Sequence, residues 1–159
     1  MTEHFLRLTL YGRGDAIRIN IEESDYAELM DGVKALAAGQ AHVPAFYLFP
    51  VSPILSVLIS VKEIQFLQSS KQPNGHDWTP VLQAGGVAFY LRGREHPLVL
   101  DYSGKGPLDD MFHGLATATY SDEVPGCIML ADGAGDAVFF RLDEVQFAVV
   151  RTELIQRPS

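Results

Sequence analysis

Two short segments each carry a glutamate and a glutamine two residues apart, and they are the first candidates for a functional site. The pairs are Glu63 with Gln65, and Glu144 with Gln146. Alternate side chains of an extended chain share one face, so each pair would place a carboxylate and an amide on the same side of a strand. The pattern fits either a solvated strand face or a polar patch that binds a ligand or a partner protein. As a functional site, these four residues are predicted to form an interaction surface.

A second candidate site follows a predicted strand later in the chain. Asp101 to Gly106 reads DYSGKG, which matches the D-x-S-x-x-G motif and in this respect resembles the PilZ domains. The resemblance covers this motif alone and implies a sensor of the nucleotide cyclic di-GMP. PilZ domains also carry an R-x-x-x-R motif before this one, whereas Arg92 and Arg94 have a shorter spacing. A strand end with a flexible turn is the alternative interpretation; the residues that the resemblance implies for ligand binding are Arg92, Arg94, Asp101 and Ser103.

Residues suited to catalysis or metal binding are sparse. Cys127 and His113 are of the types that serve as nucleophile and general base, and with Asp101 they would be the residues of a small enzyme with a pocket between two halves of the chain. Cys127, however, precedes the apolar run Ile128 to Leu130, which favours a buried, unreactive thiol. The histidines lack metal-ligand spacing, and the turn Asp132 to Asp136 has too few carboxylates for calcium. The sequence therefore predicts no catalytic residue, no metal site and no cofactor.

Charge and composition exclude some classes of partner. The chain has 159 residues and a net charge of −8, from 20 acidic and 12 basic residues. Binding to nucleic acid phosphates requires a basic face, so we expect no nucleic acid partner. The longest apolar stretch, Ile54 to Val61, is too short to span a bilayer, so we expect no membrane partner. A single cysteine and the absence of a signal-peptide pattern lead us to expect a cytoplasmic protein.

The elements that must position these residues follow from a repeat. Val57 to Phe66 reads VLISVKEIQF, and Val138 to Phe147 reads VFFRLDEVQF. Val57 and Val138 are 138 − 57 = 81 residues apart, and we call this separation the repeat offset. Around each copy the same pattern recurs: two alternating apolar segments, a helical stripe, and two further apolar segments. We therefore predict an α+β protein of two tandem homologous β-β-α-β-β halves. Their sheets would be mainly antiparallel, with one helix each, and the halves would pack around a pseudo-twofold axis.

The predicted boundaries follow from polar and turn-forming segments. The first half is 1–69, a linker is 70–86, and the second half is 87–155; the halves are expected to share one core as a single globular unit. Asp25 is predicted to cap the first helix and Gly39 to end it. The last strand of each half is predicted to bend near Lys62 or Asp143.

Alternation in the repeated strand also predicts which side chains are buried. Phe66 and Phe147 would be equivalent core residues, and Glu63 and Glu144 would face solvent. Our leading functional hypothesis is a non-catalytic binding or regulatory module that acts through protein–protein contact, with an unidentified protein or a second copy as partner. The alternatives are the small-ligand or nucleotide sensor and the small enzyme described above.

Overall fold

The computed structural model describes most of the chain as an α+β structure of antiparallel sheets and one main helix. The described residues are 3–14, 16–40, 43–70, 86–101, 112–113, 116, 128–131, 137–141 and 144–155. The predicted linker falls outside them apart from its two ends, as do Ser103 and Cys127. No helix among the described residues is long and apolar enough to cross a membrane.

The described elements are mostly strands, with one α-helix and two short 3₁₀ helices among them. They are β1 (Glu3–Leu10), β2 (Ile17–Glu22), α1 (Glu23–Ala37), β3 (Phe46–Pro50), β4 (Leu55–Ser60), the short 3₁₀ helix η1 (Val61–Glu63), β5 (Ile64–Ser70), β6 (Gly86–Leu91), β7 (Leu98–Asp101), β8 (Ile128–Ala131), β9 (Ala137–Phe140), β10 (Val145–Arg151) and the 3₁₀ helix η3 (Thr152–Leu154). Phe112, His113 and Ala116 also have helical backbone.

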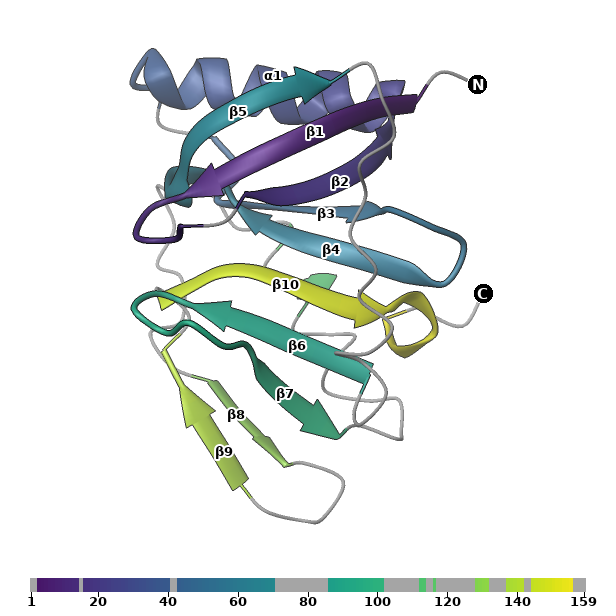
Figure 1. Ribbon diagram of the computed structural model, residues 1–159, viewed down its shortest axis with the longest axis vertical. Coiled ribbons are helices and arrows are strands. Elements are labelled where there is room, and N and C mark those ends of the chain that lie inside the picture. Colours follow the sequence, from purple (N-terminus) through teal and green to yellow (C-terminus); the bar gives the residue numbers. More distant parts are fainter. Residues whose placement is uncertain are drawn as a thin grey trace.

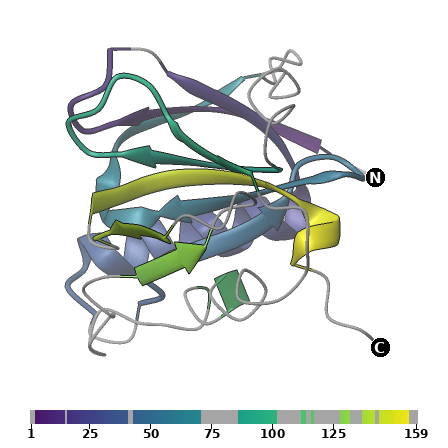
Figure 2. The ribbon, with the colours of Figure 1, turned by 90° about the horizontal axis from the view of Figure 1, so that it is seen from below.

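The described strands form three antiparallel sheets. Their strand orders are β2-β1-β5, β3-β4-β10-β6-β7 and β8-β9. In Figure 1 the three-stranded sheet and α1 lie at one end of the molecule, the β8-β9 hairpin lies at the other, and the five-stranded sheet lies between them. β10 runs through the middle of the molecule in both views, and β1 begins on the side where η3 lies (Figure 2). Because β10 pairs with β4 on one side and with β6 on the other, it joins strands from the two predicted halves into one sheet.

The first hairpin forms as its alternating sequence predicts. β1 pairs with β2 so that Leu6 lies opposite Ile19 and Leu8 opposite Ile17. All four side chains are buried, because every second residue of each strand faces the same layer. The turn between the strands contains Gly12 at a φ of 77°, a conformation that favours glycine.

The helix α1 is confirmed, but its predicted N-cap is wrong. The capping position is Glu22, which makes no side-chain capping bond, and Asp25 lies inside the first turn. Glu23 and Asp25 lie in the first turn, where the helix dipole favours negative charge, but burial and the nearby carboxylates of Glu22 and Glu28 raise the pKa of Asp25. The predicted end is confirmed: Gly39 has a φ of 74°, its N–H donates to Leu36 O, and the N–H of Gln40 donates to Ala35 O. This is the Schellman arrangement, which satisfies the last carbonyls of a helix.

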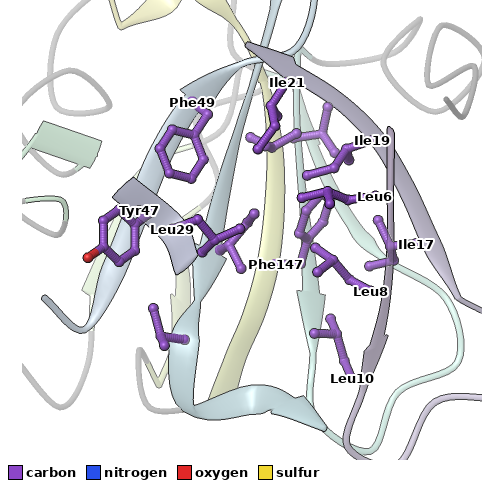
Figure 3. Packing of buried hydrophobic residues seen from close by; sticks show 14 of the residues in the cluster. Leu6, Leu8, Leu10, Ile17, Ile19, Ile21, Leu29, Tyr47, Phe49 and Phe147 are labelled. Carbon is purple, nitrogen blue, oxygen red and sulfur yellow. The ribbon is translucent and has the colours of Figure 1, made fainter. Parts of the chain in front are cut away.

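One apolar layer lies between the three-stranded and five-stranded sheets. β1 and β2 contribute alternate leucines and isoleucines, α1 contributes Leu29, and the five-stranded sheet contributes Tyr47, Phe49 and Phe147 among others (Figure 3). On the opposite face of the five-stranded sheet, a second layer includes Leu58 and Phe89, covered by Phe112 and by Leu154. The five-stranded sheet is therefore buried on both faces, which explains why Val57, Leu58 and Ile59 of β4 are consecutive, apolar and fully buried.

Several strand pairs have the same register when the residue numbers of both strands are increased by the repeat offset. Leu6 pairs with Ile19 in β1-β2, and the residues one repeat offset later, Val87 and Leu100, pair in β6-β7. The same shift relates the pairings of β1 with β5 and β6 with β10, and those of β3 with β4 and β8 with β9. Both β5 and β10 have a bulge at the same place, at Gln65 and Gln146 respectively. The predicted bend near Lys62 is also confirmed, since η1 separates β4 from β5.

The prediction that Phe66 and Phe147 are equivalent core residues is half wrong. Phe147 is fully buried, whereas Phe66 is 57% exposed. Phe147 lies in the five-stranded sheet, whose two faces are both covered, and it packs on the layer that contains Leu6 and Leu8. Among the described residues, β5 is covered on one face only, and the bulge at Gln65 places Ile64 and Leu67, rather than Phe66, on that covered face.

Candidate functional site

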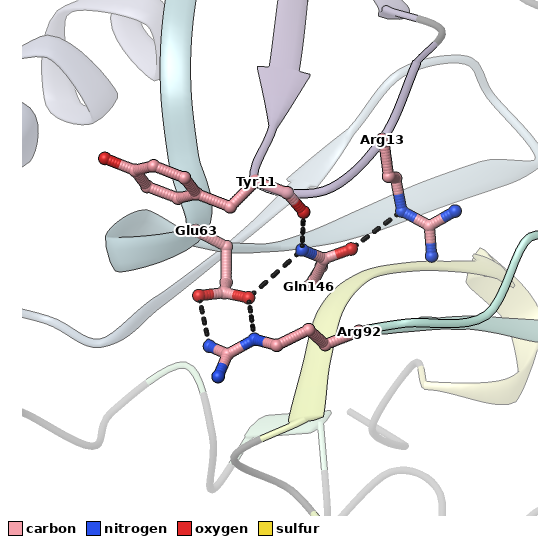
Figure 4. A network of polar contacts seen from close by, with 5 residues as sticks. All are labelled: Tyr11, Arg13, Glu63, Arg92 and Gln146. Carbon is pink, nitrogen blue, oxygen red and sulfur yellow. Dashed lines mark hydrogen bonds and ion pairs between the residues drawn. The ribbon is translucent and has the colours of Figure 1, made fainter.

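A polar network joins the two predicted halves at the turns that follow β1 and β6. It consists of Tyr11, Arg13, Glu63, Arg92 and Gln146 (Figure 4). Tyr11 and Arg13 come from the turn after β1, Glu63 from η1, Arg92 from the turn after β6, and Gln146 from the bulge of β10. We call these five residues the inter-half network.

The ion pair of Glu63 with Arg92 is the charged centre of the inter-half network. The guanidinium donates from Nε to Glu63 Oε1 at 2.9 Å and from Nη2 to Glu63 Oε2 at 2.5 Å. The Glu63 side chain is only 4% exposed, while that of Arg92 is 47% exposed. A buried carboxylate needs such a two-point partner, because an unpaired charge in this position would be costly.

Gln146 links both halves through each atom of its amide. Its Nε2 donates to Tyr11 O at 2.6 Å and to Glu63 Oε1 at 3.1 Å, and its Oε1 accepts from Arg13 Nε at 2.7 Å. The side chain is fully buried. All its polar atoms are nevertheless satisfied, as buried amides require. The bulge of β10 directs this amide away from the regular ladder and toward the turn after β1.

The Arg13 guanidinium also contacts the backbone of Leu91 and the ring of Tyr90. Its Nη2 donates to Leu91 O at 3.0 Å, and its guanidinium carbon lies 5.1 Å from the centre of the Tyr90 ring. Burial lowers the pKa of Arg13 from its ordinary value, and the interaction with Tyr90 opposes that shift. The guanidinium remains charged, because arginine titrates far above neutral pH.

Chemically, the inter-half network joins the turns after β1 and β6 to η1 and β10. The Glu63 carboxylate already accepts three hydrogen bonds, from Arg92 and Gln146. A general base or a nucleophile needs a lone pair that is directed at a substrate. The contacts of Glu63 instead direct its oxygens at neighbouring side chains of the same chain.

The structure brings together two of the four residues predicted as an interaction surface. Glu63 and Gln146 are buried and bonded to each other, so the prediction that Glu63 faces solvent is wrong. Gln65 is exposed on β5, and Glu144 is half-buried. Glu144 participates through its backbone, where its carbonyl accepts the N–H of Arg92 at 2.7 Å, as Glu63 O accepts the N–H of Tyr11.

The residues implied by the PilZ resemblance lie apart where they are described. Arg92 and Arg94 lie in the exposed turn after β6, and Arg92 is bonded to Glu63. Asp101 lies opposite Gly86, at the other end of the β6-β7 hairpin. Five residue steps of strand separate Gly86 from Leu91, which amounts to roughly 17 Å. Ser103 lies outside the described residues.

The residues considered for catalysis and metal binding are only partly described. His113 Nε2 lies 2.7 Å from the carbonyl oxygen of Ile155, near the end of the described chain. Cys127 and the turn 132–136 lie outside the described residues. The described part of the chain contains no group of three histidine, cysteine, aspartate or glutamate side chains that would hold a metal ion.

Sequence reasoning missed Tyr11 and Arg13 as members of the inter-half network. A signal was available, because the repeat offset separates Tyr11 from Arg92 and Arg13 from Arg94. These are equivalent positions in two turns that each contain a glycine with positive φ, Gly12 and Gly93. The partners themselves could not be predicted, because they depend on which strands of the two halves become neighbours.

The outer side of β5 is the other distinctive surface. In the described part of the chain, β5 pairs with β1 on one side and with no strand on the other. Phe66 is 57% exposed on the face of β5 opposite Ile64 and Leu67, and Gln65 and Gln68 are also exposed. We call the unpaired side of β5, with these three residues, the β5 edge. Its counterpart β10 is paired on both sides, with β6 and with β4.

Comparison of the chain with protein-family models, with curated proteins and with solved structures finds no match.

Proposed function

We propose that this chain is a non-catalytic binding module that acts through protein–protein contact at the β5 edge. The single observation that carries the proposal is β5 itself: in the described part of the chain this strand of seven residues is paired on one side only, and it bears a large exposed aromatic side chain. Such an edge offers backbone N–H and C=O groups to an incoming strand, and side chains such as Phe66 add apolar contact.

The composition of β5 supports this proposal. Edge strands in monomeric proteins are commonly protected by lysine, by proline or by other charges. β5 reads IQFLQSS and has no charged residue and no proline, although the chain as a whole carries a net charge of −8. Phe66 adds an exposed apolar side chain to this strand, and a partner that covered it would remove that apolar surface from water.

An internal duplication is the second part of the proposal. The recurrence of the β1-β2, β1-β5 and β3-β4 registers at the repeat offset supports descent of both halves from one β-β-α-β-β unit. A pseudo-twofold arrangement would pair β5 with β9 as β10 is paired with β4. The described strands instead leave β5 as the incomplete counterpart of β10, so a partner strand at the β5 edge would restore the missing pairing.

The experiment that tests this function places a photo-reactive residue at Gln68 and cross-links the protein in its native cell. The cross-linked partner is identified by mass and purified, and its binding is measured with isolated components. Phe66→Lys is expected to raise the Kd at least about tenfold, because it removes the apolar anchor and charges the edge.

Ile54→Lys is the matched control. Ile54 is also a large apolar residue that is exposed, at 68%, but it lies between β3 and β4. The control variant is expected to bind like the unmodified protein. Equal affinity of the purified partner for both lysine variants would contradict the proposal, since the β5 edge would then not be the contact surface.

A further inference from the structure

We propose that the strand received by the β5 edge is β9 of a second copy of this chain. This inference rests on the proposed function and names its partner. It is carried by one pairing inside the molecule, β10 with β4, whose two strands have close counterparts in β5 and β9.

The first step is the equivalence of β5 and β10. β5 pairs with β1 in the register in which β10 pairs with β6, shifted by the repeat offset, and the bulge occurs at the same step. A strand's register and bulge fix which backbone groups point to its free side. The unpaired side of β5 therefore offers the same order of donors and acceptors that β10 offers to β4.

The second step is the equivalence of β9 and β4. In β3-β4, Tyr47 lies opposite Ile59, and in β8-β9 the residues one repeat offset later, Ile128 and Phe140, lie opposite each other. β4 uses its other side to pair with β10. Among the described strands, the same side of β9 is unpaired.

The two steps together define a register. β10 pairs antiparallel with β4 so that Phe147 lies opposite Ile59 and Val149 opposite Val57. The equivalent pairing places Phe66 opposite Phe140, and Gln68 opposite Val138. Neither IQFLQSS of β5 nor AVFF of β9 contains a charge that would oppose the contact.

The position of the two strands assigns them to different copies. β5 lies beside α1 at one end of the molecule, and the β8-β9 hairpin lies at the opposite end, beyond β7 (Figure 1). The five-stranded sheet stands between them. The contact is heterologous, because the two edges are different surfaces, so assemblies larger than a dimer are compatible with it.

The first test measures the mass of the purified full chain by sedimentation over a concentration series. The unmodified chain and Ile54→Lys are expected to associate at micromolar concentrations, whereas Phe66→Lys is expected to need at least about tenfold more protein. Circular dichroism melts confirm that each variant is folded. A folded, unmodified chain that stays monomeric throughout would overturn this inference. The proposed function would survive that result if another purified protein bound the β5 edge in a Phe66-dependent way.

The second test examines the register with cysteines in a Cys127→Ser background. A mixture of the single variants Gln68→Cys and Val138→Cys is expected to form an intermolecular disulfide, because directly opposed residues have Cα atoms close enough for that bond. A mixture of Gln68→Cys with Ala131→Cys, whose cysteine lies on β8, is the control and should cross-link far less. If the double variant Gln68→Cys/Val138→Cys instead forms a disulfide within a monomer, β9 reaches its own β5 and the inference is wrong.

Discussion

Phe66 and Phe147 occupy the same position after equivalent bulges, yet one is largely exposed and the other is fully buried. The rings of Phe147 and Tyr90 form an edge-to-face pair, with 5.8 Å between ring centres, inside the layer that the two larger sheets share. The difference arises because the described residues cover the five-stranded sheet on both faces but cover the sheet of β5 on one.

This pair makes a matched test of burial. Phe147→Ala is expected to lower the free energy of unfolding by about 3–5 kcal/mol, the usual cost of a large aromatic truncation in a core. Phe66→Ala, measured at a concentration where the chain is monomeric, is expected to change it by no more than about 0.5 kcal/mol. Urea melts of both variants decide the matter, and equal losses would show that Phe66 is buried after all.

Much of the fold was predictable from periodicity. Two alternating apolar segments, a helical stripe and two further apolar segments were predicted in that order, and β1, β2, α1, β3 and β4 follow it. These elements were predictable because the periodicity of apolar residues is read within a single segment of the chain. The start of α1 was less predictable. Aspartate is favoured both as the capping residue and inside the first turn of a helix, so Asp25 alone does not define where the helix begins.

The site was less predictable, for a physical reason. A bulge is fixed by the register with the neighbouring strand, and the bulges at Gln65 and Gln146 shift the alternation on which the predicted faces depended. The burial of Glu63 depends on Arg92 and Gln146, which come from the other half. A sequence repeat shows that two positions are equivalent, but it does not show which one will be covered.

Glu63 and Glu144 provide a second matched test. Glu63→Gln is expected to cost about 1–3 kcal/mol, because it weakens the two-point bond to Arg92 and leaves a buried amide hydrogen beside donors. Glu144→Gln should stay within about 0.5 kcal/mol, since the contact of Glu144 with Arg92 uses its backbone. Thermal or urea unfolding of the two variants is the measurement. A large effect at Glu144 together with a small one at Glu63 would reverse the roles assigned above.

The pH dependence of stability provides a third test, at Tyr47. Burial, and then the carboxylates of Glu28 and Asp31, raise the pKa of Tyr47 above its ordinary value of 10.0. Because the folded state favours the neutral phenol, the resulting stability is present below the unfolded pKa and is lost as pH rises through the folded one. Tyr47→Phe should therefore lose less stability than the unmodified chain between neutral pH and strongly alkaline pH. Urea midpoints of both proteins across that range are compared, and parallel curves would exclude a contribution from Tyr47.

The close approach of α1 to β3 supports a last prediction. Gly32 is buried at the middle of α1, and a Cβ added there would lie 2.7 Å from Tyr47 Cε2 and 2.8 Å from Tyr47 Cζ. In an exposed helix interior, glycine to alanine stabilises by about 1 kcal/mol. Here the added methyl group must displace a packed ring, so Gly32→Ala is expected to destabilise by about 1–3 kcal/mol.

The cause can be separated by removing the ring. Tyr47→Ala alone should destabilise by about 3–5 kcal/mol as a core truncation. In that background the added methyl group of Gly32→Ala finds space, and the helix propensity of alanine should then make the substitution neutral or stabilising. A double-mutant cycle in urea yields the coupling energy between the two positions directly. Additive effects would mean that Tyr47 is not what requires glycine at position 32.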